Sequence, residues 1–292
     1  MLPGGSSRRM KLRRLTDTPE EIAVVDRLLV RAYGFGSRRA ELEMYFRAQP
    51  DGWFVLEDRG EIVAVAGAIA YGHFCWVGLV ATDPGRQRQG LATTISRHCV
   101  EWARVRGCAT IALDASGAGR PVYERLGFQA VGGTAELSLP PEIPDASGST
   151  SVRRASREGI DALLGLDRRI FGADRGRLLR DLSRQDDARC YVAEISGEVR
   201  GYLFARKRLL GPGCAVDEAS ARELVRAALA DRIASGVDGR PHLLLPIESR
   251  YRDLLLGLGL RIERRLAHMR LGDSVLPGER AQLLAQMSYA SG

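Results

Sequence analysis

The sequence predicts an α/β protein of the α+β kind, built from two domains that each have a mixed, mainly antiparallel sheet flanked by helices. An apolar run at 76–82 reads as a buried strand, and it leads through a glycine-containing turn into a helical pattern at 91–102. Strand patterns at 53–57 and 62–71 are separated by a short turn, which is typical of antiparallel pairing. The second half repeats this order, and 292 residues are enough for two domains.

Each element of the first half follows from a local pattern. The alternating segment Leu12–Leu15 predicts a short strand, and Thr18–Glu21 supplies a cap, a proline and a reciprocal acid that begin a helix. Tyr33–Gly36 ends that helix, and Ser37 is expected to cap a second one that runs through Arg47. The later strands are expected at 53–57, 62–71, 75–82, 110–114 and 134–139, with a helix from 91 that stops at Gly107.

The turn after the apolar run has the properties of an anion site. It reads Thr82-Asp83-Pro84-Gly85-Arg86-Gln87-Arg88-Gln89-Gly90-Leu91-Ala92-Thr93. The first amides of a helix have no internal partner, and the helix dipole adds partial positive charge at that end. Because Gly90 and Ala92 carry little or no side chain, a ligand can approach the backbone closely. The sequence therefore predicts a phosphate site at the start of this helix.

Two motifs resemble those of one enzyme superfamily. The pattern Gln87-x-x-Gly90-x-Ala92 is similar to the acyl-CoA motif Q/R-x-x-G-x-G/A of the GCN5-related N-acetyltransferases (GNAT). Downstream, Tyr123-Glu124-Arg125-Leu126-Gly127-Phe128 is similar to the second motif of the same family, Y-x-x-x-G-F. The two motifs stand in the order that this family requires, and the element order agrees with its fold. The alternative is a phosphate-binding α/β turn of another family.

The resemblance implies an acetyl-CoA-dependent N-acetyltransferase that acts on a primary amine, by direct transfer in a ternary complex and without a metal. Tyr123 matches the tyrosine that gives a proton to the departing thiolate, although a packed core tyrosine is the alternative. The residues expected to bind acetyl-CoA, largely through their backbone, are Leu79, Val80, Ala81, Thr82, Gln87, Arg88, Gln89, Gly90, Leu91, Ala92 and Thr93.

Two positions depart from the family pattern. The family often has a glycine where Arg88 stands, and many members have an asparagine in the region that here reads 115–120. No residue identifies itself as the general base, although His73 and Glu43 are candidates by position. The acceptor groove is expected between the Tyr33–Ser37 loop and the second domain, and a tandem pair favours a small-molecule amine over a protein lysine.

The second half is a degenerate copy of the first. Segments of the two halves correspond at offsets of about 132 to 140 residues, as Phe35-Gly36 does to Phe171-Gly172. In the second half, the segment that corresponds to the glycine-containing turn carries Asp217 and Glu218 where phosphates would lie. Leu255 stands at the position that corresponds to Tyr123. We therefore expect a catalytic domain at 1–142 and a degenerate domain at 150–292 that shapes the substrate groove, joined by a linker rich in proline and serine.

Charge and composition restrict the partners. The net charge is +7, but the arginines are interspersed with acids and form no basic run with interleaved aromatics, so nucleic-acid binding is the less favoured reading. No apolar run reaches the length of a membrane span, and the N-terminus has no signal-peptide core. The five cysteines form no C-x-x-C pair, which favours a reduced, cytoplasmic protein, either monomer or homodimer. A rival hypothesis is a non-catalytic acyl-CoA sensor.

Overall fold

The computed structural model describes residues 10–140, 151–234, 241–272 and 275–292. The expected N-terminal tail and almost all of the linker lie outside these residues. The first half contains β1 (Lys11–Arg14), α1 (Pro19–Tyr33), α2 (Arg39–Ala48), β2 (Trp53–Asp58), β3 (Glu61–Ala70), β4 (Phe74–Thr82), the 3₁₀ turn η1 (Pro84–Arg86), α3 (Leu91–Val105), β5 (Thr110–Ala115), α4 (Arg120–Glu124) and β6 (Gln129–Ser138).

The second half repeats the order of strands and α-helices, with differently placed 3₁₀ turns and with one strand added at its end. It contains β7 (Val152–Arg154), η2 (Glu158–Leu163), α5 (Leu164–Phe171), α6 (Gly176–Ser183), β8 (Arg189–Ile195), β9 (Glu198–Ala205), β10 (Leu209–Ala215), α7 (Glu218–Ala234), β11 (His242–Pro246), α8 (Arg252–Gly257), β12 (Arg261–Leu271), η3 (Arg280–Gln282) and β13 (Leu283–Ala285). The added strand, β13, has no counterpart among the described residues of the first half.

The helix ends show which local signals were correct. The hydroxyl of Thr18 accepts a hydrogen bond from the Glu21 amide at 3.3 Å, and Gly34 ends α1 in the left-handed conformation with φ of 69°. The carboxylate of Glu21, however, accepts from the Thr16 amide rather than from Thr18. The second helix begins at Arg39 with Arg38 at the cap position, one residue later than a Ser37 cap would place it, although the Ser37 hydroxyl accepts from the Arg39 amide at 3.2 Å as a capping side chain would.

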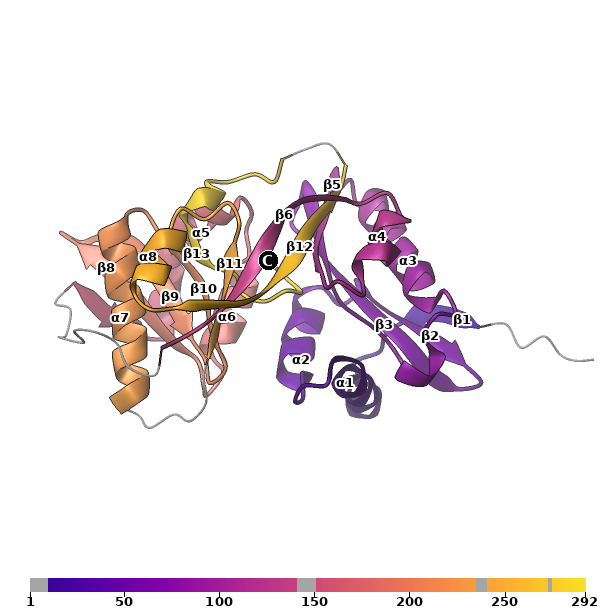
Figure 1. The fold of residues 1–292 in the computed structure, drawn as a ribbon. Coiled ribbons are helices and arrows are strands. Elements are labelled where there is room, and N and C mark those ends of the chain that lie inside the picture. Colours follow the sequence, from indigo (N-terminus) through magenta and orange to yellow (C-terminus); the bar gives the residue numbers. More distant parts are fainter. Residues whose placement is uncertain (1–9, 141–150, 235–240, 273–274) are drawn as a thin grey trace, which may run out of the picture.

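The strands of both halves form one continuous sheet. Among the described residues the order is β1-β2-β3-β4-β5-β12-β6-β11-β10-β9-β8-β7, with β13 beside β10. The last long strand of each half is thus exchanged: β12 lies between β5 and β6, and β6 lies between β12 and β11. Figure 1 shows β6 and β12 crossing the middle of the molecule, between the two lobes. Each half therefore completes the sheet of the other.

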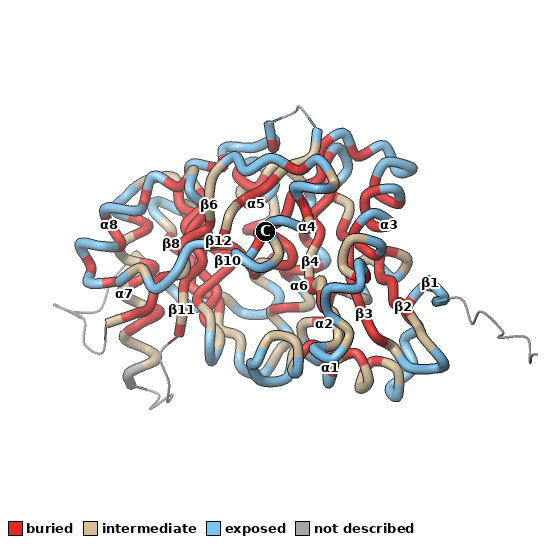
Figure 2. Tube along the Cα trace, turned by 45° about the vertical axis from the view of Figure 1, so that its right-hand side comes forward, coloured by how far each residue is buried: buried red, intermediate tan, exposed pale blue. Residues whose placement is uncertain are grey.

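Helices cover both faces of the sheet, and one core is shared by the two halves. The helices α3 and α4 pack on one face of the first half, whereas α1 and α2 pack on the other. The side chains under α1 and α2 form a single buried cluster with those of α5 and α6. Buried residues run through the strands of both lobes and across their junction (Figure 2). Among the described residues, no helix is long and apolar enough to cross a bilayer.

Candidate active site

The turn between β4 and α3 presents a row of free amides. Gly90 caps α3 with φ of 79°, and Arg88 also has a positive φ, of 61°. This left-handed backbone explains why glycine suits position 88, since a β-carbon is disfavoured there. Among the described residues, the amides from Arg88 to Thr93 have no hydrogen-bond partner. They are the donors that an oxyanion at a helix start would use.

Positive charge surrounds these amides. The guanidinium of Arg86 is 2.5 Å from the Asp58 carboxylate, and it also donates to the Gln89 side chain at 3.3 Å. The hydrogen bond from Arg86 lowers the pKa of Asp58, so this pair stays ionised. On the α1 side, Arg31 pairs with Asp83 at 2.8 Å. These ion pairs fix η1 and leave the Arg88 side chain exposed beside the turn.

The strand that leads into the turn, β4, separates from the neighbouring strand β5 before it ends. The parallel pairing of β4 with β5 ends at Trp76, which lies opposite Ala112. Beyond Trp76, β4 bulges at Leu79, where φ is 49°. The β4 backbone from Leu79 to Thr82 thus has no strand partner among the described residues on the β5 side. The Val80 carbonyl accepts a hydrogen bond from the Tyr33 hydroxyl at 3.1 Å.

Tyr123 belongs to the buried cluster that packs under α3 and α4. It sits in α4, is 8% exposed, and packs edge-on against Phe128 with ring centroids 5.9 Å apart. Burial raises the pKa of Tyr123, with a smaller effect of Cys99, so its phenol keeps its proton at neutral pH. Burial also raises the pKa of Tyr33, and the neighbouring Tyr123 adds to that shift. Tyr33 on α1 and Tyr123 on α4 thus belong to helices that pack on opposite faces of the sheet of the first half.

In the second half, a segment of the chain fills the corresponding gap between two parallel strands. Pairing of β10 with β11 ends at Leu210, and β13 then pairs with β10 through Gly213 and Cys214. On the other side, the Gln286 amide donates to the Leu244 carbonyl at 2.8 Å. The segment from 211 to 215, expected in the turn, lies within β10, so only two residues separate this strand from α7. The backbone edge that is open in the first half is thus occupied in the second.

The two candidate general bases lie on different elements of the first half. His73 is in the turn before β4, at the opposite end of this strand from Thr82, and its carbonyl accepts from the Ala109 amide. Glu43 lies on α2, where its carboxylate pairs with Arg39 at 2.7 Å. His73 is therefore not beside the open edge of β4, and the Glu43 carboxylate is held in an exposed ion pair on α2.

The junction of the two halves borders the Tyr33–Ser37 loop. The guanidinium carbon of Arg264 on β12 is 5.8 Å from the Phe35 ring and 5.5 Å from that of Tyr289. Glu136 accepts from Arg264 at 2.5 Å and from the Tyr289 hydroxyl at 2.8 Å. The loop thus faces residues of the exchanged strand pair and of the segment after β13.

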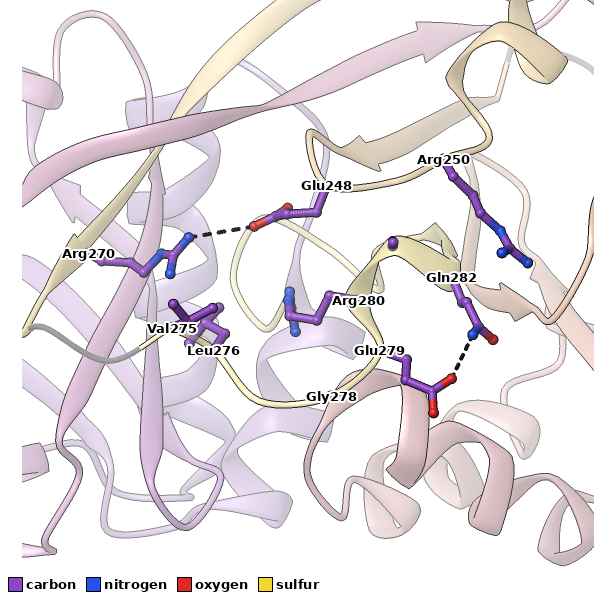
Figure 3. A pocket seen from close by; sticks show the side chains of 10 residues that line it. Glu248, Arg250, Arg270, Val275, Leu276, Gly278, Glu279, Arg280 and Gln282 are labelled. Carbon is purple, nitrogen blue, oxygen red and sulfur yellow. Dashed lines mark hydrogen bonds and ion pairs between the residues drawn. The ribbon is translucent and has the colours of Figure 1, made fainter.

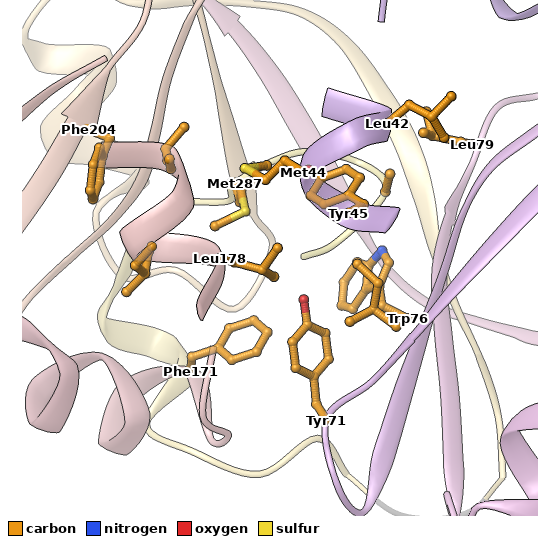
Figure 4. Packing of buried hydrophobic residues seen from close by; sticks show 14 of the residues in the cluster. Leu42, Met44, Tyr45, Tyr71, Trp76, Leu79, Phe171, Leu178, Phe204 and Met287 are labelled. Carbon is orange, nitrogen blue, oxygen red and sulfur yellow. The ribbon is translucent and has the colours of Figure 1, made fainter. Parts of the chain in front are cut away.

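Sequence reasoning missed the segment 286–292. It packs inside the shared core, where the Trp76 indole donates to the Tyr289 carbonyl and the Tyr71 hydroxyl donates to the Ser291 carbonyl, both at 3.0 Å. Figure 4 shows Met287 among side chains of both halves, near Tyr45 and Trp76. A β-carbon on Gly78 would lie 2.3 Å from the Ala290 Cα, so the close approach requires glycine there. No local pattern marks this segment, because its partners are distant in sequence; Trp76 and Tyr71 are more than two hundred residues away.

Comparison with known proteins agrees with this fold. Residues 22–128 match the sequence model of the acetyltransferase (GNAT) family, and residues 163–285 match that of an acetyltransferase (GNAT) domain. The chain therefore belongs to the GNAT family. It is an acetyltransferase with two GNAT domains in tandem.

Several known proteins are similar to this chain. An uncharacterized N-acetyltransferase of Bacillus subtilis, YitH, is 26% identical over 211 residues, which are 68% of this chain and 71% of that protein. The crystal structure of a putative acetyltransferase from Pyrococcus horikoshii superposes with a TM-score of 0.84 at 24% identity, covering 100% of this chain and 99% of that one. A tandem GNAT protein from the clavulanic acid biosynthesis pathway gives a TM-score of 0.62 at 14% identity, covering 91% and 100%.

Proposed function

We propose that the protein transfers the acetyl group of acetyl-CoA to a primary amine of a small molecule, directly and within a ternary complex. The observation that carries this proposal is the difference between the halves. The first half has free amides from Arg88 to Thr93 and an open edge of β4, whereas β13 fills the second. We expect one acetyl-CoA per chain, held by the backbone from Leu79 to Thr82 and by the turn from Gln87 to Thr93.

The residues of the first half have distinct roles in this proposal. The free amides and the positive end of α3 hold the pyrophosphate, and the open edge of β4 offers peptide groups to the pantetheine arm. Tyr123 holds a proton close to the place where the thioester sulfur would lie. These contacts orient the donor before the amine arrives, which removes part of the entropic cost of the reaction.

The transfer step needs one proton donor and one neutral amine. The amine nitrogen bonds to the thioester carbonyl carbon, the carbon–sulfur bond breaks, and the sulfur takes the proton of Tyr123. The amine loses its extra proton to water, and Tyr123 is reprotonated through solvent. The pKa of Tyr123, raised by burial, keeps the donor protonated at neutral pH.

Two measurements test this proposal. Calorimetric titration of the intact chain with CoA should give a stoichiometry near one, and two sites of similar affinity would contradict the assignment of the second half. A panel of small primary amines with acetyl-CoA, read as released thiol, should identify acceptors. Thiol release that never exceeds hydrolysis of acetyl-CoA alone would contradict a small-amine acceptor and favour the sensor hypothesis.

A further inference from the structure

A cavity of about 370 Å³ lies at the junction, on the side of the second half (Figure 3). Its walls come from the β11–α8 loop, the end of β12 and the segment 275–282. Arg270 on β12 lies opposite Ala112 of β5, which in turn lies opposite Trp76 of β4. Trp76 precedes Thr82 by six residues, or roughly 20 Å of strand at about 3.3 Å per residue. The cavity is therefore separate from the proposed acetyl-CoA turn.

One edge of a buried guanidinium lining the cavity is unpaired. Arg280 is only 6% exposed, and its Nη1 donates to the Phe171 carbonyl at 3.1 Å. Among the described residues, its Nε and Nη2 donate no hydrogen bond, and no carboxylate lies within 4.0 Å of it. Burial lowers the pKa of Arg280 to about 10, which expresses the cost of a charge without a partner. The Nε–Nη2 edge matches the two oxygens of a carboxylate.

An incompletely paired carboxylate shares the cavity. The Oε1 atom of Glu248 is 3.7 Å from Nη2 of Arg270, too far for a hydrogen bond, and within the described chain this carboxylate accepts none. Arg270 also has a buried Nε without a partner. Figure 3 shows Arg270, Glu248 and Arg280 around a common space. The cavity thus contains cationic hydrogen-bond donors and an anionic acceptor that have no hydrogen-bond partner among the described residues.

The other charges of the cavity are already satisfied. Glu279 accepts from Arg169 at 2.9 Å and from the Gln282 side chain at 2.6 Å. Arg250 donates to the Val216 carbonyl and to the Tyr251 hydroxyl. The groups with unmet hydrogen-bonding capacity are therefore Arg280, with Arg270 beside it, and Glu248, whose one ion pair among the described residues is the 3.7 Å contact with Arg270.

We propose that this cavity binds a small α-amino acid. Its carboxylate pairs with the free edge of Arg280, and its ammonium group pairs with Glu248. Val275 and Leu276 line the same cavity and offer an apolar wall to the side chain. The volume lies within the range of about 300–1,000 Å³ that is usual for small-molecule sites. A simple anion such as phosphate fits less well, because it would satisfy Arg280 but face the carboxylate of Glu248.

The test uses the intact chain and defined probes. The standard L-α-amino acids are titrated calorimetrically, with inorganic phosphate, succinate and n-butylamine as probes of the separate charges. At least one amino acid should bind with a stoichiometry of one, and more tightly than any of the three single-sign probes. Because each hydrogen bond to a charged group contributes about 1.5–3 kcal/mol, Glu248→Gln and Arg280→Lys should each weaken binding by roughly tenfold or more.

A control variant and two results that would overturn the proposal complete the experiment. Arg252→Gln removes an exposed charge outside the cavity and should leave affinity unchanged. Should Arg280→Lys fail to fold, Glu248→Gln still decides the question. The proposal is overturned if no amino acid binds at about 10 mM. It is equally overturned if phosphate binds more tightly than every amino acid with no effect of Glu248→Gln. Neither result depends on whether an amine acceptor for acetyl-CoA is found.

Discussion

His268 Nδ1 lies 3.0 Å from Asp114 Oδ1, and the two residues come from opposite halves of the chain. They face each other where the exchanged strand β12 pairs with β5. Both side chains are buried, and the Thr134 hydroxyl also donates to Asp114 at 3.0 Å. This polar contact lies in the seam that joins the two halves.

The first prediction is that this contact couples the stability of the halves. His268→Ala leaves a buried carboxylate with one partner fewer, which should lower the free energy of unfolding by at least about 1–3 kcal/mol. A double-mutant cycle with Asp114→Ala, followed by urea unfolding, should give a coupling energy of about 0.5–3 kcal/mol. Strictly additive effects would show that the two side chains do not stabilise each other.

The second prediction concerns the amides at the start of α3. Gly90→Glu places a carboxylate among them, and CoA affinity should fall by more than tenfold, or more than about 1.4 kcal/mol. The fold should survive because residue 90 is exposed in a surface turn.

Since Gly90 has a positive φ, any side chain there also introduces backbone strain. Gly90→Ala is the matched control, because a β-carbon at this position meets no atom within 4 Å. It should lower stability to a similar degree but weaken CoA binding much less than Gly90→Glu. Equal losses of affinity in both variants would assign the effect to backbone strain instead of charge.

The third prediction concerns Tyr123. Tyr123→Phe removes the hydroxyl but keeps the ring that packs on Phe128. CoA affinity and Tm should therefore change little, whereas kcat on an acceptor amine should fall by about 10²–10⁴, the usual contribution of a general acid.

Tyr251→Phe in the second half provides the contrast. The Tyr251 hydroxyl donates to the Ala215 carbonyl, far from the parting of β4 and β5, so this variant should lose stability and keep its kcat. If Tyr123→Phe instead lost stability with an unchanged kcat, Tyr123 would be a core residue without a role in proton transfer.

The fourth prediction is a pH dependence at the junction. Burial alone would raise the pKa of Glu136, but hydrogen bonds from Arg264 and Tyr289 outweigh it and lower the pKa. A carboxylate with a lowered folded-state pKa stabilises the fold above its unfolded pKa of about 4.3, and this contribution disappears as pH falls through the folded value. Glu136→Gln should therefore lower Tm at about pH 7 and make a smaller difference below about pH 4.

Scanning calorimetry of both proteins across this range measures the difference. Glu43→Gln is a suitable control, because Glu43 and Arg39 form an exposed ion pair that should contribute little at any pH. A Tm difference for Glu136→Gln that stayed constant with pH would mean that its ionisation does not contribute to stability.

The sequence predicted what depends on neighbouring residues. The cap at Thr18, the strand that ends at Thr82 and the helix that starts at Leu91 all follow from local patterns, and the structure confirms them. Repetition of these patterns predicted two similar domains, which the family matches confirm.

What the sequence could not predict depends on distant pairing. A strand was predicted at 134–139, but nothing in 129–138 specifies that it pairs with 261–270. The insertion of β13 beside β10 and the burial of 286–292 against Trp76 depend on the same long-range packing. Interactions at the candidate site, such as the bond from Tyr33 to Val80, therefore became visible only in three dimensions.

The central run β5-β12-β6-β11 reads the same from either half, with an antiparallel pair at its middle. This strand order has the symmetry of an isologous dimer in which two subunits exchange their last strands about a two-fold axis. A single chain with this topology behaves as a dimer whose subunits are permanently joined but free to diverge. A substitution in one copy leaves the other unchanged, so one copy can keep an open edge on β4 while the other fills its own.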